Sequence, residues 1–155
     1  MFELLIYMFE NYLSAQSKLD FNNMSLELEA AGFDNDEIKI AFDWFTQLKV
    51  MSDKVPLKLK NRTKPKLRIY TANENEKISP DALGFLIFLE QAQVLNDYER
   101  EIIIDRSMAL NQNFISIDEI RWIVMMTLWN NGKENDYLFV EDALYQKEQF
   151  RDRKS

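Results

Sequence analysis

The sequence predicts a mainly α protein: a winged-helix-like N-terminal unit with a small β-hairpin, followed by a four-helix C-terminal unit. Three observations support this fold class. Apolar residues recur at the three- and four-residue spacing of amphipathic helices over most of the chain. Capping signals, a Ser, Asn or Asp three residues before a Glu, open several of these segments. Between residues 50 and 78, prolines and alternating leucines break the helical pattern and favour extended chain.

Three helices are predicted before this break. The first covers 2–15, where apolar side chains share one face. The second covers 23–31 and ends at Gly32, since glycine readily adopts the left-handed conformation that terminates many helices. The third covers 34–48 and opens on an acidic variant of the capping box. The order helix, helix, turn, helix and hairpin is that of a winged helix-turn-helix.

The hairpin and the remaining helices follow in order. The hairpin strands are expected at 56–60 and 66–71. Ser79-Pro80, Asn96-x-x-Glu99 and Ser116-x-x-Glu119 each supply a helix start. The four predicted helices cover about 80–95, 96–110, 116–131 and 136–148. A glycine inside a helix costs about 1 kcal/mol relative to alanine, so close helix packing is expected at Gly84.

The hairpin is the predicted joint between two units, 1–71 and 72–155. The chain has 155 residues, which is roughly one domain, and shows neither an internal repeat nor a low-complexity linker. We therefore expect the two units to pack as one compact body.

Composition argues against an enzyme. The chain has no His and no Cys, which removes the commonest general base, the thiol nucleophile and the main ligands of transition metals. Its three isolated glycines form no phosphate-binding loop. The remaining carboxylates form no recognisable catalytic pair, and the sequence implies no cofactor and no metal.

Localisation is predicted to be cytoplasmic. Glu3 and Glu10 interrupt the apolar N-terminus, and no early cation precedes it, so it does not read as a signal peptide. No stretch reaches the roughly 18 apolar residues of a membrane-spanning helix, and no membrane partner is expected.

Charge is divided unevenly along the chain, although it sums to −7. Residues 1–53 carry 3 cations and 10 anions, whereas residues 72–155 carry 9 cations and 16 anions. Residues 54–71 carry seven cations and no anion. Alternate residues of a strand share a face, so the six even-numbered cations from residue 58 onward are the candidate contacts to a phosphate backbone. They are Lys58, Lys60, Arg62, Lys64, Lys66 and Arg68.

Two other interpretations of this basic segment remain open. Lysines on an exposed hairpin keep it soluble and block edge-to-edge strand pairing. The segment could also dock on the acidic helices of the same chain. Recognition of the DNA major groove is disfavoured, because the helix beginning near Asp34 presents three carboxylates in its first turn and these repel phosphates.

The helix predicted at 116–131 is apolar on most of its faces. Such a helix is central in its bundle or buries a face in an oligomer. Met125 and Met126 stand beside Trp122, and core packing is the expected use of these side chains. The alternative is an adaptable partner site, which flexible methionines next to a tryptophan suit.

Five stretches of the chain resemble the bacterial Smg family, and they occur in the same order. They lie at 1–12, 28–33, 67–71, 84–96 and 120–128. The resemblance implies a small, mostly helical, cytoplasmic proteobacterial protein of unknown function. It also implies a gene near that of a DNA-processing protein, and it supplies no catalytic residue.

The sequence therefore predicts a non-enzymatic protein-interaction or regulatory module with an unidentified protein partner. The alternative is a nucleic-acid-binding protein that contacts phosphates through the basic hairpin, residues 54–68. A homo-oligomer is compatible with both. Replacement of all six hairpin cations by Gln abolishes binding to nucleic acid if the alternative holds.

Overall fold

The computed structural model describes residues 2–13, 21–54, 68–133, 135, 137–138 and 141–142. Within these residues the regular structure is helical, apart from one isolated β-bridge. The elements are α1 Phe2–Met8, the π-helix η1 Phe9–Leu13, α2 Phe21–Ala30, α3 Asn35–Asp53, α5 Ala72–Lys77, α6 Pro80–Gln91, α7 Asp97–Met108 and α8 Ile117–Asn130.

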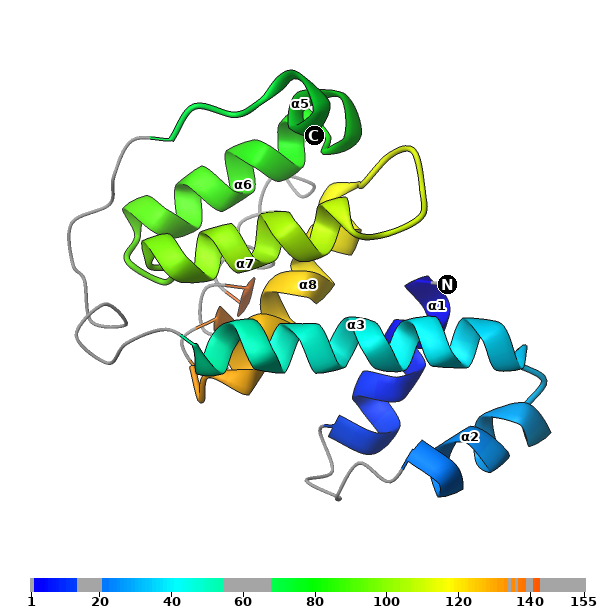
Figure 1. Cartoon of the computed structure of the whole chain (residues 1–155). Coiled ribbons are helices and arrows are strands. Elements are labelled where there is room, and N and C mark those ends of the chain that lie inside the picture. The colour runs from blue at the N-terminus through cyan, green and yellow to red at the C-terminus, as the bar shows by residue number, and fades with distance from the viewer. Residues whose placement is uncertain are drawn as a thin grey trace, which may run out of the picture.

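Helix α3 crosses the molecule and separates two groups of helices (Figure 1). Helices α6 and α7 lie side by side on one side of it, α2 lies on the other, and α1 passes behind it. Helix α8 contacts α3, α6 and α7, and it is the element that joins these layers.

A single apolar core runs through these helices, from Leu4 in α1 to Tyr137 near the end of the described chain. Helix α8 supplies much of it, which confirms the expected central position of this segment. Its buried residues are Ile120, Ile123, Val124, Met126, Thr127 and Leu128. Removal of this apolar surface from water is the main force that holds the layers together.

The predicted helix caps at Ser79, Asn96 and Ser116 are confirmed. The Asn96 side chain accepts a hydrogen bond of 2.8 Å from the Glu99 amide, and the Glu99 carboxylate accepts one of 3.0 Å from the Asn96 amide. Ser116 and Glu119 form the same reciprocal pair before α8. Each box satisfies two backbone donors that a helix start would otherwise expose.

The turn after α2 also follows the prediction. Gly32 has φ of +101°, and the Phe33 amide donates to the Leu28 carbonyl at 3.0 Å. The Gly32 amide donates to the Glu29 carbonyl, which completes a Schellman motif.

The predicted β-hairpin and winged-helix unit are wrong. Residues 68–70, the described end of the second predicted strand, are not in a strand, and the rest of the hairpin at 55–67 lies outside the described residues. Arg68 turns toward Glu74 and Glu101 instead of following an alternating strand pattern. The fold class is therefore all-α over the part of the chain that the structure describes.

Helix α3 also differs from a helix that enters a DNA groove. It extends to Asp53, beyond the predicted end at residue 48, and it packs on α1, α7 and α8. Trp44 is 3% exposed, and its indole Nε1 donates to the Arg106 carbonyl in α7 at 2.9 Å. The division of the chain at residue 71 stays a prediction.

The first predicted helix changes its geometry part-way. Residues 2–8 are α-helical and residues 9–13 form a π-helix, a form that is usually short and is often found at functional sites. Phe9, 6% exposed, meets the edges of Trp122 and Trp129, with ring centroids 6.4 and 5.9 Å apart. The π-helix η1 thus supports α8 through the contacts of Phe9 with two of its tryptophans.

Two loops are joined by the isolated β-bridge between Ile78 and Ile115. The Ile115 amide donates to the Lys77 carbonyl at 2.7 Å, and the Ser79 amide donates to the Ile115 carbonyl at 3.0 Å. Both isoleucines are fully buried. The described residues between 135 and 142 are helical, as expected for the last predicted segment. Within the described ranges, none of the helices has the length and apolar character needed to cross a bilayer.

Candidate functional site

A pocket of about 470 Å³ opens between α8 and the helical residues Tyr137 and Glu141. One face of α8 forms its first wall, because residues three and four apart on a helix point the same way. The lining residues are Asp118, Arg121, Trp122, Met125, Tyr137 and Glu141. Pockets that hold a ligand or the side chains of a partner have volumes of about 300–1,000 Å³.

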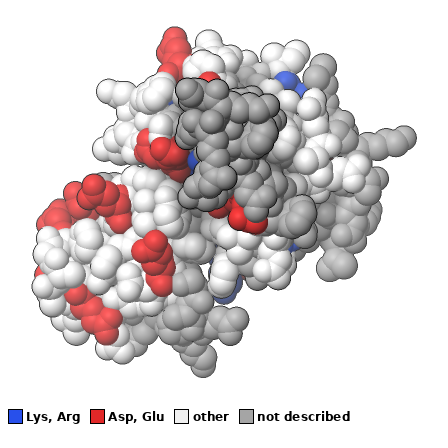
Figure 2. Space-filling view, turned by 180° about the vertical axis from the view of Figure 1, so that it is seen from behind, with Lys and Arg blue, Asp and Glu red and all other residues white. Residues whose placement is uncertain are grey.

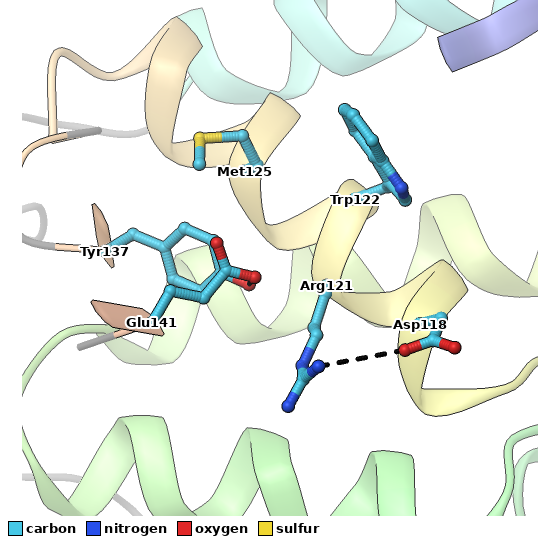
Figure 3. A pocket seen from close by; sticks show the side chains of 6 residues that line it. All are labelled: Asp118, Arg121, Trp122, Met125, Tyr137 and Glu141. Atoms are coloured by element: carbon cyan, nitrogen blue, oxygen red, sulfur yellow. Dashed lines mark hydrogen bonds and ion pairs between the residues drawn. The ribbon is translucent and has the colours of Figure 1, made fainter. Parts of the chain in front are cut away.

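The walls of the pocket combine apolar and charged side chains (Figure 3). Trp122 and Met125 come from α8, and Tyr137 faces them from the opposite wall. Trp122 and Met125 are both half-buried, whereas Met126 on the next position of the helix is 2% exposed. The structure therefore assigns Met126 to the core and Met125 to the pocket.

Charged groups of both signs lie at the pocket. Arg121 Nη1 is 3.7 Å from Asp118 Oδ1, and the Arg121 guanidinium carbon is 5.6 Å from the centroid of the Phe85 ring. This stacking holds the guanidinium against α6 by a cation–π interaction. Glu141 stands on the opposite wall, so the two carboxylates flank a single cation.

Tyr137 is fixed as a neutral hydrogen-bond donor. Its side chain is fully buried, and its hydroxyl donates to Glu141 Oε1 at 3.0 Å. Burial raises the pKa of Tyr137, and the neighbouring Glu141 carboxylate raises it further. The ring also meets Phe85 edge-on, with centroids 6.4 Å apart. Tyr137 therefore ties this wall of the pocket to α6 through Phe85.

The chemistry of the lining suits binding. Tryptophan, tyrosine, methionine and arginine are the residues enriched where proteins recognise each other. The groups of the lining include no nucleophile activated by an adjacent base. No group of three or more metal-binding side chains occurs among the residues the structure describes.

A second polar feature is a chain of five ion-paired residues at the junction of α5, α6 and α7. Arg68 makes a bidentate pair with Glu74, at 2.7 and 2.9 Å, and a 2.6 Å pair with Glu101. Glu101 also pairs with Arg100, whose Nη1 is 2.7 Å from Glu90 in α6. The ion-pair chain therefore alternates in sign and runs from Glu74 to Glu90 in the order Glu74, Arg68, Glu101, Arg100, Glu90.

Glu74 has two functions in this ion-pair chain. Its carboxylate binds Arg68, and it also accepts the Thr71 amide at 2.9 Å as part of the capping box of α5. The Arg68 guanidinium is the main cause of a pKa of Glu74 lowered from 4.5 to about 2. The start of α5 and the ion-pair chain therefore depend on the same carboxylate.

Replacement of Arg68 by Gln is expected to lower stability at pH 7 by about 1–3 kcal/mol, a value discounted because a fifth of the Arg68 side chain is exposed. A carboxyl whose folded pKa is depressed stabilises the protein above its unfolded pKa. In the parent, this stabilisation is lost as pH falls from 4.5 to about 2. Urea unfolding of the parent and of Arg68→Gln, measured at pH 7 and again near pH 2, should show a difference in stability that is smaller at the lower pH. An equal difference at the two pH values would contradict the assignment.

The predicted nucleic-acid contacts are only partly covered by the structure. Lys58, Lys60, Arg62, Lys64 and Lys66 lie outside the described residues. Arg68 is described, and its guanidinium contacts Glu74, Glu101 and the face of Tyr70, 4.8 Å from the ring centroid. Phosphate contact by all six residues stays a prediction.

The comparison with family models assigns residues 1–151 to a protein family of unknown function, DUF494. The curated relatives bear one name, Protein Smg homolog, and the chain is 49% identical to the relative from Methylobacillus flagellatus over 145 residues, 94% of this chain and 95% of that protein. The chain belongs to the Smg family. This confirms the resemblance seen in the sequence.

Other Smg homologs match over the same extent. The relative from Aeromonas hydrophila is 39% identical over 94% of this chain and 95% of its own length. The relative from Shewanella sp. strain ANA-3 is 37% identical over 95% of both chains. No solved structure matches the chain. The family description names no activity, so the function must be argued from the site.

Sequence reasoning singled out two of the six lining residues. Met125, together with Met126, was considered beside Trp122 as an adaptable partner site, but core packing was the preferred interpretation, and Tyr137 and Glu141 were not named as site residues. Their signal is the four-residue spacing that places both on one face of the last predicted helix. The start of α5 was also missed, although Thr71-x-x-Glu74 is a capping box within the predicted strand region.

Proposed function

We propose that this Smg-family protein is a non-enzymatic interaction module that binds a basic segment of a protein partner at the α8 pocket. The observation that carries the proposal is the access to Trp122 and Met125 on a helix that otherwise forms the core. An apolar side chain of the partner enters between these residues and Tyr137. Its flanking cations face Asp118 and Glu141.

The composition of the pocket supports a protein partner. Interface energy concentrates in aromatic and arginine anchors at a concave site surrounded by polar groups. Trp122 and Arg121 provide such anchors, and Met125 adapts its shape to the entering side chain. Asp118 is 83% exposed in its side chain, so it is available at the rim for an arriving cation.

The charge of the surface supports a basic partner. Residues 21–53, the acidic lobe, carry seven carboxylates and two lysines, and all seven carboxylates are exposed. Figure 2 shows acidic patches over this lobe, at the lower left. A field of one sign steers an oppositely charged segment to the surface and raises its association rate. The same field repels phosphate groups.

The first experiment captures partners from nuclease-treated lysate of the native host with the immobilised protein, and then measures binding of the purified partner by isothermal titration calorimetry. We expect Met125→Glu and Trp122→Ala to weaken binding at least 10-fold, because each changes the part of the pocket that receives the partner's apolar side chain. Binding should also weaken as ionic strength rises.

Ile40→Ser is the matched control, because Ile40 is an apolar residue 53% exposed on α3 and outside the pocket. It should bind as the parent does. Circular dichroism and the urea midpoint establish that each variant is folded before binding is compared. The proposal fails if no protein is captured after nuclease treatment, or if the captured protein binds the folded Met125→Glu variant as well as the parent.

A further inference from the structure

One face of α6 is uncharged, apolar and exposed. The exposed residues of this face follow the helical repeat, and the opposite side of the helix is buried in the core. Ile87 and Phe88 are each 43% exposed, which is unusual for two adjacent large apolar residues. The α6 face consists of Pro80, Gly84, Ile87, Phe88 and Gln91.

Gly84 occupies the middle of this face, and the fold of the single chain does not explain it. Glycine in a helix interior costs about 1 kcal/mol relative to alanine. The predicted close packing at Gly84 is wrong for the described residues, since the residue is exposed and an added Cβ would meet no atom within 4 Å. The absent side chain leaves a hollow on the outer surface of α6.

The hollow and the ring beside it are complementary to each other. Gly84 and Phe88 are four residues apart, so they lie one helical turn apart on the same face. If two copies of α6 pack antiparallel about a two-fold axis near residue 86, Phe88 of each copy lies over Gly84 of the other. A two-fold interface has this property, since it uses the same surface patch on both subunits.

We propose that the α6 face is a homodimer interface in which Phe88 of each chain fills the hollow at Gly84 of the other. The charges of the helix agree with a second copy as the occupant. Its carboxylates are Asp81 at the edge and Glu90, which is buried against Arg100, and it carries no cation. The antiparallel register places Asp81 opposite Gln91 of the other copy, where an amide can donate to the carboxylate.

The dimer should be weak and should respond to salt in the opposite sense to the partner complex. A face built on one helix of 12 residues is smaller than the roughly 800 Å² per partner of a standard interface, so we expect a dissociation constant on the order of 10–100 μM. Each chain carries a net charge of −7, and this repulsion is screened as ionic strength rises. Salt therefore strengthens the dimer.

Sedimentation equilibrium of the full chain from about 5 to 500 μM tests the interface. We expect reversible dimerisation, tighter at 0.5 M than at 0.05 M NaCl, and a loss of at least 10-fold in affinity for Phe88→Glu. Gly84→Ala should weaken the dimer while it raises the urea midpoint of the monomer, because alanine favours the helix but fills the hollow. Ile40→Glu and Trp122→Ala should leave the dimer unchanged.

Cross-linking tests the register without altering Gly84 or Phe88. The chain has no native cysteine, so Asp81→Cys and Gln91→Cys each introduce a unique thiol. A mixture of the two variants treated with a short bismaleimide should give several-fold more covalent dimer than either variant alone. A chain that stays monomeric at 500 μM, a dimer that persists in Phe88→Glu, or equal cross-linking in all three samples would overturn the proposal.

Discussion

Replacement of Arg100 by Met is expected to destabilise the protein by about 3–5 kcal/mol at pH 7, because it leaves the Glu90 carboxylate buried without its cation. The side chains of Arg100 and Glu90 are 6% and 9% exposed, and their atoms are 2.7 Å apart. For a chain of this size, the loss corresponds to a fall of about 6–20 °C in the melting midpoint. Scanning calorimetry and urea unfolding measure both quantities.

The pH dependence of this variant has a defined sign. Burial raises the pKa of Glu90 even in the parent, and the Arg100 charge offsets part of that rise. Without Arg100 the pKa rises further, so the folded variant binds a proton more tightly than the unfolded chain does. The difference in stability between the parent and Arg100→Met should therefore shrink as pH falls from 7 to 5.

A matched double variant separates the buried charge from simple packing. Glu90→Gln combined with Arg100→Met removes both charges, and it should recover at least half of the lost stability. A double variant no more stable than Arg100→Met, or a deficit that grows toward pH 5, would show that Glu90 is not the cause.

Replacement of Phe9 by Ala should cost about 3–5 kcal/mol and should loosen the wall of the pocket. Phe9 is 6% exposed, and its ring supports Trp122 and Trp129 from the side away from solvent. The cavity left by alanine removes an aromatic contact from each indole. Two of the three tryptophans of the chain are affected, since Trp44 lies against Phe45 and α7 instead.

Tryptophan fluorescence measures the effect on the pocket without a known partner. In folded Phe9→Ala protein, quenching by acrylamide should increase as Trp122 and Trp129 become more accessible. Phe9→Leu is the control, because it keeps most of the volume and should cost less than about 1.5 kcal/mol. If Phe9→Ala shows unchanged quenching and a urea midpoint like that of the parent, the supporting role of η1 is contradicted.

The elements that sequence reasoning placed correctly are those fixed by local interactions. The caps at Asn96 and Ser116 and the turn at Gly32 are set within three to six residues, so a short stretch of sequence contains all that determines them. The apolar residues on most faces of α8 also indicated a central helix, with burial in an oligomer as the alternative, and the structure places α8 in the core.

The errors fall where distant residues decide the structure. The alternation of cations and leucines favoured a strand ending at residue 71, but Arg68 pairs with Glu101, 33 positions away. No local pattern reveals such a pair, and tertiary contacts override β propensity. The pocket was missed for the same reason, because Trp122 and Tyr137 come together only after the chain has folded back on α8.

The β-bridge between Ile78 and Ile115 has a consequence for the exchange of backbone hydrogens with solvent. Loop amides usually exchange quickly, because small local openings expose them. The amides of Ser79 and Ile115 are bonded across two loops that are 37 residues apart and tied to fully buried side chains. Their deuterium uptake should therefore follow global unfolding, as it does for amides in the middle of α8.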